Sequence, residues 1–173
     1  MVLAMLSFAL VSLAAQSREA QIKAAFVFNF VQFTEWPAES FATTNSPLII
    51  AVSGAPPVEQ ALKEITHGET MRGHPFEVRP VSSPVQAAQA HILFVASSES
   101  ARWQEYRNVC DGRPVLTVSD MPGFARRGGM IELFTRENKL RLRANPETAR
   151  RAHLQLSSRL LRLAEIVESG GEE

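Results

Sequence analysis

The sequence predicts an α/β fold, a layered sandwich in which helices flank a mostly parallel central sheet with an antiparallel hairpin at its edge. Short apolar runs of strand character, such as 48–52 and 90–95, alternate along the chain with helical segments. This alternation is typical of parallel sheets that are covered on both faces. Two later runs, 130–134 and 140–144, lie on either side of the turn 136–139, as in an antiparallel hairpin.

Length and composition favour a single domain, which we place at residues 19–168. The chain has 173 residues and a formal net charge of zero. Domains commonly contain about 100–200 residues, and a neutral chain has no general attraction for nucleic acid or for an anionic membrane. We therefore expect no nucleic-acid partner, and we interpret the late arginine pairs, 126–127 and 150–151, as a solvated surface.

The first segment, residues 1–15 (MVLAMLSFALVSLAA), is apolar, carries no charge and ends in small residues. It is too short to cross a bilayer comfortably and is typical of a signal peptide. The basic residues that normally precede such a segment are missing, as if it were truncated at its N-terminus. An uncleaved membrane anchor and a buried core helix are the alternatives, and we expect an exported, periplasmic protein.

A helix is predicted from Glu19 to Phe33. Ile22, Phe26, Phe30 and Phe33 form one apolar stripe, and other apolar residues fill much of the remaining surface. A helix that is apolar almost all round is buried on more than one side. It lies either deep in the domain or partly against a partner, and it ends before Pro37 because the residue preceding a proline disfavours the α region.

The central part of the chain alternates between strands and helices. Two prolines at the start of 56–65 suit the first turn of a helix, and the prolines that bound 74–80 indicate a strand near a sheet edge. The predicted elements, in order, are the strand 48–52, the helix 56–65, the strands 74–80 and 90–95, the helix 100–108 and the strand 114–118.

The C-terminal part begins with a half-exposed strand, 140–144, in which leucines alternate with arginines. Asn145, Pro146 and Glu147 then supply an N-cap, a first-turn proline and an acid at the positive end of a helix. A further helix is predicted over about 157–168. We expect the tail, 169–173, to be disordered.

The segment 119–129 is the strongest candidate for a binding loop. It follows the buried strand 114–118 and contains Pro122, Gly123 and the pair Gly128–Gly129. Open α/β sheets place ligand contacts in such loops at the ends of strands. The loop has neither a catalytic pair nor a metal-ligand cluster, and Asp120 fits an Asx turn better than a catalytic role. This pattern favours recognition over chemistry.

Other motifs give no support to catalysis or to a cofactor. The turn 53–56 lacks the glycines and lysine of a phosphate loop, and no serine has the surroundings of a nucleophile elbow. The four histidines, 67, 74, 91 and 153, do not have metal-site spacing. The single cysteine, Cys110, excludes an intramolecular disulfide. We expect no catalytic residue, metal or cofactor, and a small hydrolase is the least supported alternative.

Four ordered blocks together resemble the YfiR family of small periplasmic proteins. They are KAAFVFNFVQFTEWP (23–37), PVLTVSDMPGFARRGGMIELF (114–134), KLRLRANPETA (139–149) and LQLSSRLLRLA (154–164). The resemblance implies an exported α/β domain that forms a homodimer. It also implies a repressor that binds the periplasmic sensor region of an inner-membrane diguanylate cyclase, which lowers cyclic-di-GMP and biofilm formation. The stabilising disulfides of that repressor cannot form here, so a small-molecule or cell-envelope signal replaces a redox trigger.

The resemblance also suggests which residues form a binding region. Phe28, Asn29, Phe33 and Trp36 are expected at a core edge or groove; Asp120, Phe124, Gly128 and Gly129 in a loop beside it; and Arg143, Asn145, Ser157 and Ser158 at its border. These positions either bind a ligand or partner or simply specify the fold, and Trp36 suits core packing and a partner anchor equally. The alternative function is a small-molecule-binding module acting on a membrane sensor histidine kinase.

Overall fold

The computed structural model describes the backbone of residues 2–170 and the side chains from Gln16 onward. Residues 171–173 of the predicted tail, and the side chains on which the signal-peptide prediction depends, lie outside the described residues. Within the described part, no helix combines the length and apolar character that a membrane span requires.

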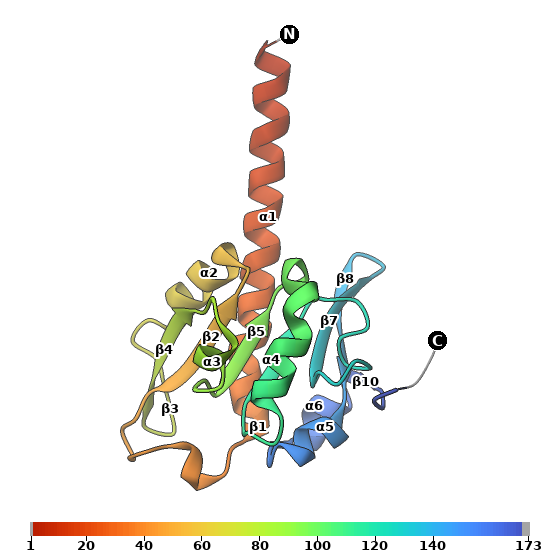
Figure 1. Cartoon of the computed structure of the whole chain (residues 1–173). Helices are drawn as coiled ribbons and strands as arrows, with labels where there is room; N and C mark the ends of the chain where they lie inside the picture. Colours follow the sequence, from red (N-terminus) through yellow and green to blue (C-terminus); the bar gives the residue numbers. More distant parts are fainter. Residues whose placement is uncertain (1, 171–173) are drawn as a thin grey trace.

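The described strands form a large sheet of eight and a small sheet of two, which confirms the predicted fold class (Figure 1). The order in the large sheet is β10-β8-β7-β6-β5-β2-β4-β3, and the neighbours from β4 to β7 are parallel. The strands are β1 (Thr34–Glu35), β2 (Leu48–Ser53), β3 (Thr70–Met71), β4 (His74–Pro80), β5 (Ile92–Val95), β6 (Leu116–Ser119), β7 (Ile131–Arg136), β8 (Lys139–Ala144), β9 (Gln155–Leu156) and β10 (Ala164–Ile166).

Helices lie on both sides of the large sheet (Figure 1). The α-helices are α1 (Val2–Phe30), α2 (Pro56–Thr66), α3 (Pro84–Ala87), α4 (Trp103–Cys110), α5 (Pro146–Arg151) and α6 (Ser158–Leu161), and 3-10 turns cover 31–33, 38–40 and 97–102. Asn145 caps α5 as predicted, because its side chain accepts a hydrogen bond from the Thr148 amide at 3.0 Å.

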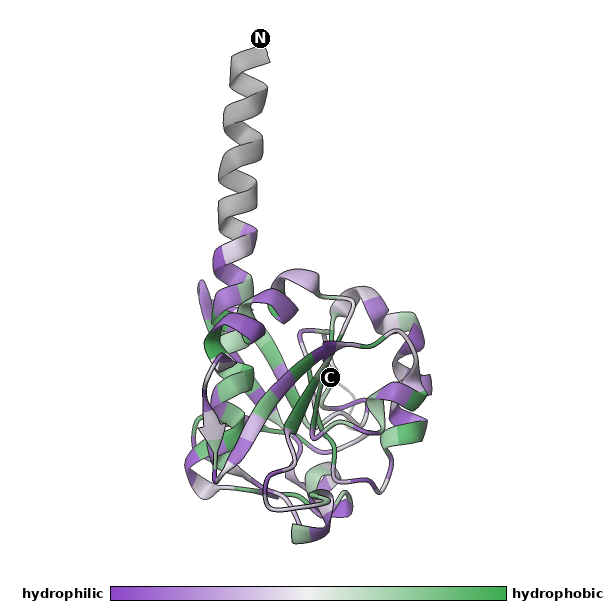
Figure 2. Cartoon of the chain, turned by 90° about the vertical axis from the view of Figure 1, so that its left-hand side faces the viewer, coloured by the Kyte–Doolittle hydropathy of each residue, from purple (hydrophilic) through white to green (hydrophobic). Residues whose placement is uncertain are grey.

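The central strand β5 is buried on both faces and divides the core into two clusters. Ile92 and Phe94 pack with residues of α1 and α2, whereas Leu93 and Val95 pack with residues of α3 and α4. Successive side chains of a strand point to opposite faces, so an unbroken apolar run requires cover on both sides. Figure 2 shows the strands in the centre, with helices on either side whose ribbons carry both hydrophilic and hydrophobic residues.

The buried stripe of α1 differs from the predicted one. Ile22 is 42% exposed, and Phe26 and Phe33 are only partly buried. The buried stripe instead contains small residues toward its N-terminal side and larger ones at its end, namely Ala20, Ala24, Val27 and Phe30, and it continues at Val31 in the 3-10 turn after the helix. These residues also follow helical spacing, and the alanines allow the helix axis to come close to its neighbours.

The prediction of one helix over about 157–168 is wrong in its second half. Residues 158–161 are helical, but Ala164–Ile166 forms β10, which pairs in parallel with β8. The amide of Val167 extends this pairing by donating to the Ala144 carbonyl at 2.9 Å. The β7–β8 hairpin is therefore one strand in from the sheet edge.

The predicted disordered tail begins at Ser169, but its first two residues form hydrogen bonds. The Asn145 side-chain amide donates to Ser169 Oγ at 2.9 Å, and the Gly170 amide donates to the Arg126 carbonyl at 3.1 Å.

Asp120 joins α1 to the carboxyl ends of two central strands. Its Oδ2 lies 2.6 Å from Lys23 Nζ, and its Oδ1 accepts a hydrogen bond from the Ser97 amide at 2.7 Å. Burial lowers the pKa of Lys23, but the hydrogen bonds to Asp120 and Glu19 outweigh it, so this pKa lies above its ordinary value. The ion pair is largely buried and fixes the position of α1 over the sheet.

We expect Lys23 and Asp120 to be energetically coupled. In a double-mutant cycle with Lys23→Met and Asp120→Asn, the coupling free energy should be about 1–3 kcal/mol, because charged hydrogen-bonded groups away from water interact strongly. Urea unfolding of the four proteins measures it. The pair Glu147 and Arg150 in α5, whose side chains are 54% and 69% exposed, is the control, and it should give only about 0.2–0.5 kcal/mol. Equal coupling in the two pairs would contradict this role.

Candidate functional site

The loop between β6 and β7, residues 120–130, has the conformation that its glycines require. Gly128 has φ of +87°, which L side chains rarely adopt. Gly129 lies against the ring of Phe124, where a Cβ atom would come within 2.1 Å of Cε1. Ser119, rather than Asp120, forms the turn that opens the loop, because its Oγ accepts a hydrogen bond from the Met121 amide at 3.0 Å. The predicted Asx turn at Asp120 is thus replaced by the contacts with Lys23 and Ser97.

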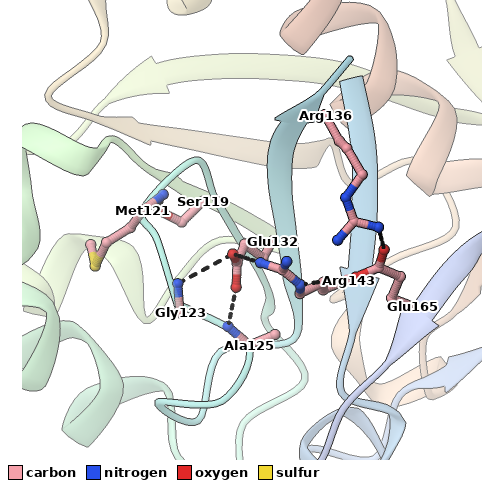
Figure 3. Close-up of polar contacts among 8 residues, drawn as sticks. All are labelled: Ser119, Met121, Gly123, Ala125, Glu132, Arg136, Arg143 and Glu165. Carbon is pink, nitrogen blue, oxygen red and sulfur yellow. Dashed lines mark hydrogen bonds and ion pairs between the residues drawn. The ribbon is translucent and has the colours of Figure 1, made fainter. Parts of the chain in front are cut away.

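A buried carboxylate holds the loop against the hairpin (Figure 3). Glu132 in β7 has a side chain only 1% exposed. Its Oε1 accepts hydrogen bonds from the Gly123 amide at 3.2 Å and from Arg143 at 2.8 Å, and its Oε2 accepts one from the Ala125 amide at 3.2 Å. A buried charge is tolerated only when it is paired and hydrogen-bonded, and Glu132 meets both conditions. We call Glu132 and Arg143 the loop clip.

Arg143 is itself held from several directions. Its Nε donates to Glu165 Oε2 in β10 at 3.2 Å, and its guanidinium carbon lies 3.9 Å from the centre of the Phe134 ring. Glu165 also binds Arg136 at the outer side of the hairpin (Figure 3). Because β8 pairs with both β7 and β10, the Arg143 side chain connects three strands to the loop. The sequence predicts Arg143 as a site residue but not its partner Glu132. The signal for Glu132 was a single charged residue within the apolar run 130–134.

Asn145 is the second anchor of the loop and is fully buried. Its side-chain amide donates to the Ala125 carbonyl at 3.0 Å, and its backbone amide donates to the Met130 carbonyl at 2.8 Å. The loop is therefore held through its backbone at several points. The carboxylates of Asp120 and Glu132 are both occupied by structural partners, so this arrangement supplies a fixed shape for recognition and offers neither group as a free general base.

A cluster of aromatic rings lies at the opposite end of the sheet, beside the amino ends of β2, β4 and β5. Phe41 is stacked between His74, at 3.9 Å between ring centres, and His91, at 4.5 Å. Trp36 meets the His91 ring edge-on and donates a hydrogen bond from Nε1 to the His91 carbonyl at 3.2 Å. The segment 35–47, orange in Figure 1, contributes Trp36 and Phe41 from beneath the strands.

His91 is neutral and buried in this cluster, and its ring joins two backbone segments. Its Nδ1 accepts a hydrogen bond from the Ile49 amide at 3.0 Å, so the proton lies on Nε2, which donates to the Ser40 carbonyl at 3.0 Å. Burial lowers the pKa of His91, and the nearby charges of His74 and Arg79 act in the same direction, despite the hydrogen bond to Ser40. A proton added at Nδ1 would break the bond to Ile49.

A cavity of about 170 Å³ opens beside the aromatic cluster. Its walls come from the segment that follows α1, from the start of β2 and from the β3–β4 hairpin; the lining residues are Val31, Thr34, Trp36, Phe41, Leu48, Met71, Arg72 and His74. The Oγ1 atom of Thr34 is buried and has no hydrogen-bond partner in the part of the chain that the structure describes. Of the residues predicted for a binding site, Trp36 is the one in this lining.

The predicted site residues fall into separate groups rather than one groove. Asp120, Phe124, Gly128, Gly129, Arg143 and Asn145 belong to the loop and its anchors, and Trp36 lines the cavity. The Phe33 carbonyl accepts a hydrogen bond from the Ser157 amide at 2.8 Å next to the small β1–β9 sheet, and Phe28 packs against Phe76 of β4. Asn29 and Ser158 are exposed, so Asn29 needs no buried partners.

Cys110 is a buried thiol whose pKa is raised to about 12 by burial, an effect that nearby Arg113 partly offsets. A thiol that stays protonated is a poor nucleophile and a poor redox sensor. In the described part of the chain, no three His, Cys, Asp or Glu side chains converge as a metal site would require.

Comparison with protein families gives a match over most of the chain. The family model described as YfiR/HmsC-like matches residues 20–165, which confirms the resemblance recognised in the four sequence blocks. Comparison with curated proteins gives no match. The matched range contains the loop with its clip and also every residue that lines the cavity.

The loop clip leads to a prediction about stability. Arg143→Met should lower the free energy of unfolding by about 3–5 kcal/mol, because it leaves the Glu132 charge buried without its cation. Denaturant unfolding measures this change. Arg136→Met is the matched control: this side chain is 56% exposed and its loss should cost about 1 kcal/mol or less. Similar losses in the two variants would show that the clip does not stabilise the fold.

His91 should make stability depend on pH. Its folded pKa lies below the unfolded value of about 6.5, so its contribution is complete above that pH and is lost as the pH falls toward the folded pKa. The loss can reach about 1.4 kcal/mol per pH unit in that window. Urea unfolding at pH 7.5 and 5.5 should show a smaller decrease for His91→Gln than for the unaltered protein. His67→Gln, at an exposed position, should leave the decrease unchanged.

Proposed function

We propose a regulatory function for this chain, which belongs to the YfiR/HmsC-like family. In this proposal the protein is exported to the periplasm, where it binds the periplasmic sensor region of an inner-membrane diguanylate cyclase. Binding represses the cyclase and thereby lowers cyclic-di-GMP and biofilm formation. The observation that carries the proposal is the family match over residues 20–165, which spans the α/β core and both ends of the sheet.

The proposed mechanism is stoichiometric rather than catalytic. A bound regulator shifts its sensor toward the inactive conformation only to the extent that it binds this conformation more tightly than the active one. A rigid recognition surface helps because little conformational entropy is lost on binding. The loop 120–130 supports such a role, since the loop clip and Asn145 hold its backbone in place.

The signal that ends repression is proposed to be a small molecule or a change in the cell envelope. The lone Cys110 is buried and remains protonated, so it is badly suited to sense oxidants. A cavity large enough for a small ligand favours a chemical signal. The same cavity gives some support to the alternative function, a small-molecule-binding module that acts on a sensor histidine kinase.

We also propose that the protein acts as a homodimer, as the family resemblance implies. Sedimentation of the purified protein tests this part separately from the regulatory role.

Deleting the gene should raise cellular cyclic-di-GMP several-fold if the partner is a cyclase, and the full chain supplied from a plasmid should restore the lower level. Cyclic-di-GMP is measured in extracts by mass spectrometry. The control is the same chain without residues 1–15, which should fold in the cytosol but fail to restore the lower level.

Two outcomes would contradict this proposal. An unchanged cyclic-di-GMP level after deletion would exclude a cyclase partner and shift support to the sensor kinase. Equal restoration by the chain without residues 1–15 would exclude action in the periplasm.

A further inference from the structure

The residues that line the cavity beside the aromatic cluster suit a flat, largely apolar ligand. Trp36 and Phe41 contribute two aromatic rings, and Val31, Leu48 and Met71 contribute aliphatic surface. Ligand sites are typically apolar concavities with a few placed polar groups. The walls are also well supported, because Phe41 is stacked between two histidines and Trp36 is hydrogen-bonded to the β5 side of the sheet.

Thr34 supplies an unsatisfied polar group in this cavity. The residue is 1% exposed, and its Oγ1 has no hydrogen-bond partner in the described structure. A buried hydroxyl without a partner is unfavourable and is rare in folded proteins. The backbone of Thr34 is held by pairing with Leu156 in the small sheet, and the residue lines the cavity. Rotation about its Cα–Cβ bond can therefore turn the hydroxyl toward a molecule that enters the cavity.

Size and charge restrict the chemistry of that molecule. The cavity of about 170 Å³ is comparable with the roughly 150 Å³ that holds a benzene ring in a protein interior. A water molecule needs several polar partners to be held in place, and most of the lining here is apolar. Arg72, in the β3–β4 turn, is an exposed residue of the lining, so its guanidinium brings a positive charge to the cavity mouth.

We propose that this cavity binds a single-ring aromatic carboxylate that also carries a hydrogen-bonding substituent. The ring packs between Trp36 and the aliphatic wall, the substituent bonds to Thr34 Oγ1, and the carboxylate pairs with Arg72. This site does not depend on the proposed partner, since the walls and the unsatisfied hydroxyl belong to this chain alone.

The proposal is tested with two probes that differ only in the group that Thr34 would bind. 4-Hydroxybenzoate and benzoate are titrated into the purified full chain, with binding followed by calorimetry and by the rise in melting temperature that ligand binding produces. Both should bind, and 4-hydroxybenzoate should bind about 3–10-fold more tightly, as expected for one added hydrogen bond.

Variants then locate the probes in the cavity. Thr34→Val keeps the side-chain shape and removes a hydroxyl that has no protein partner, so folding should be unaffected. It should abolish the preference for 4-hydroxybenzoate and change benzoate affinity less than twofold. Arg72→Gln should weaken both probes about tenfold, because charge-assisted hydrogen bonds are the stronger ones. Arg113→Gln, in the exposed turn before β6, is the matched control and should leave both affinities unchanged.

Three results would overturn the inference: no binding of either probe at millimolar concentration, an unchanged preference in Thr34→Val, or equal effects of Arg72→Gln and Arg113→Gln. None of these measurements involves a cyclase, so their failure would leave the regulatory proposal standing, and failure of the regulatory proposal would leave this site intact.

Discussion

The structure depends on burying both faces of the central parallel strands. Because β5 has apolar side chains on each face, helices must cover the sheet on both sides, and α1 is the long element that covers one of them. This helix is fixed at two levels. Lys23 pairs with Asp120 near the carboxyl ends of the strands, and the segment after the helix pairs with β9 at the other end. The loop and the cavity therefore lie at opposite ends of one scaffold.

Three buried polar groups show different ways in which this fold accommodates polarity. Glu132 is charged and is satisfied by Arg143 and by two loop amides. His91 is neutral and uses both ring nitrogens to join backbone segments. Thr34 Oγ1 has no partner among the described residues. The first two groups specify the structure through their contacts, whereas the third is a departure from the usual rule of satisfaction. In our proposal, a ligand in the cavity supplies the missing partner.

The two proposals assign different tasks to the two ends of the sheet. The clipped loop presents a fixed backbone shape at one end, which suits recognition of a protein surface. The cavity at the other end is small and apolar, which suits a single ring. Helix α1 contacts the loop region through Lys23, and the 3-10 turn that directly follows the helix contributes Val31 to the cavity. A ligand would influence partner binding only if it favoured one of two arrangements of this helix.

The sequence by itself determined the fold class and most element positions, because these depend on local patterns. Apolar runs such as 90–95 indicated buried strands, and Asn145–Pro146 indicated a helix start that the structure confirms. The segment 164–166 was wrongly predicted as helix, since its apolar spacing suits a helix and only the free edge of β8 makes it a strand. The residues predicted to form one groove lie in separate groups in the structure. Only tertiary structure decided that Glu132 meets Arg143 and that Thr34 lacks a partner, because contacts between residues distant in sequence depend on packing and leave no local pattern.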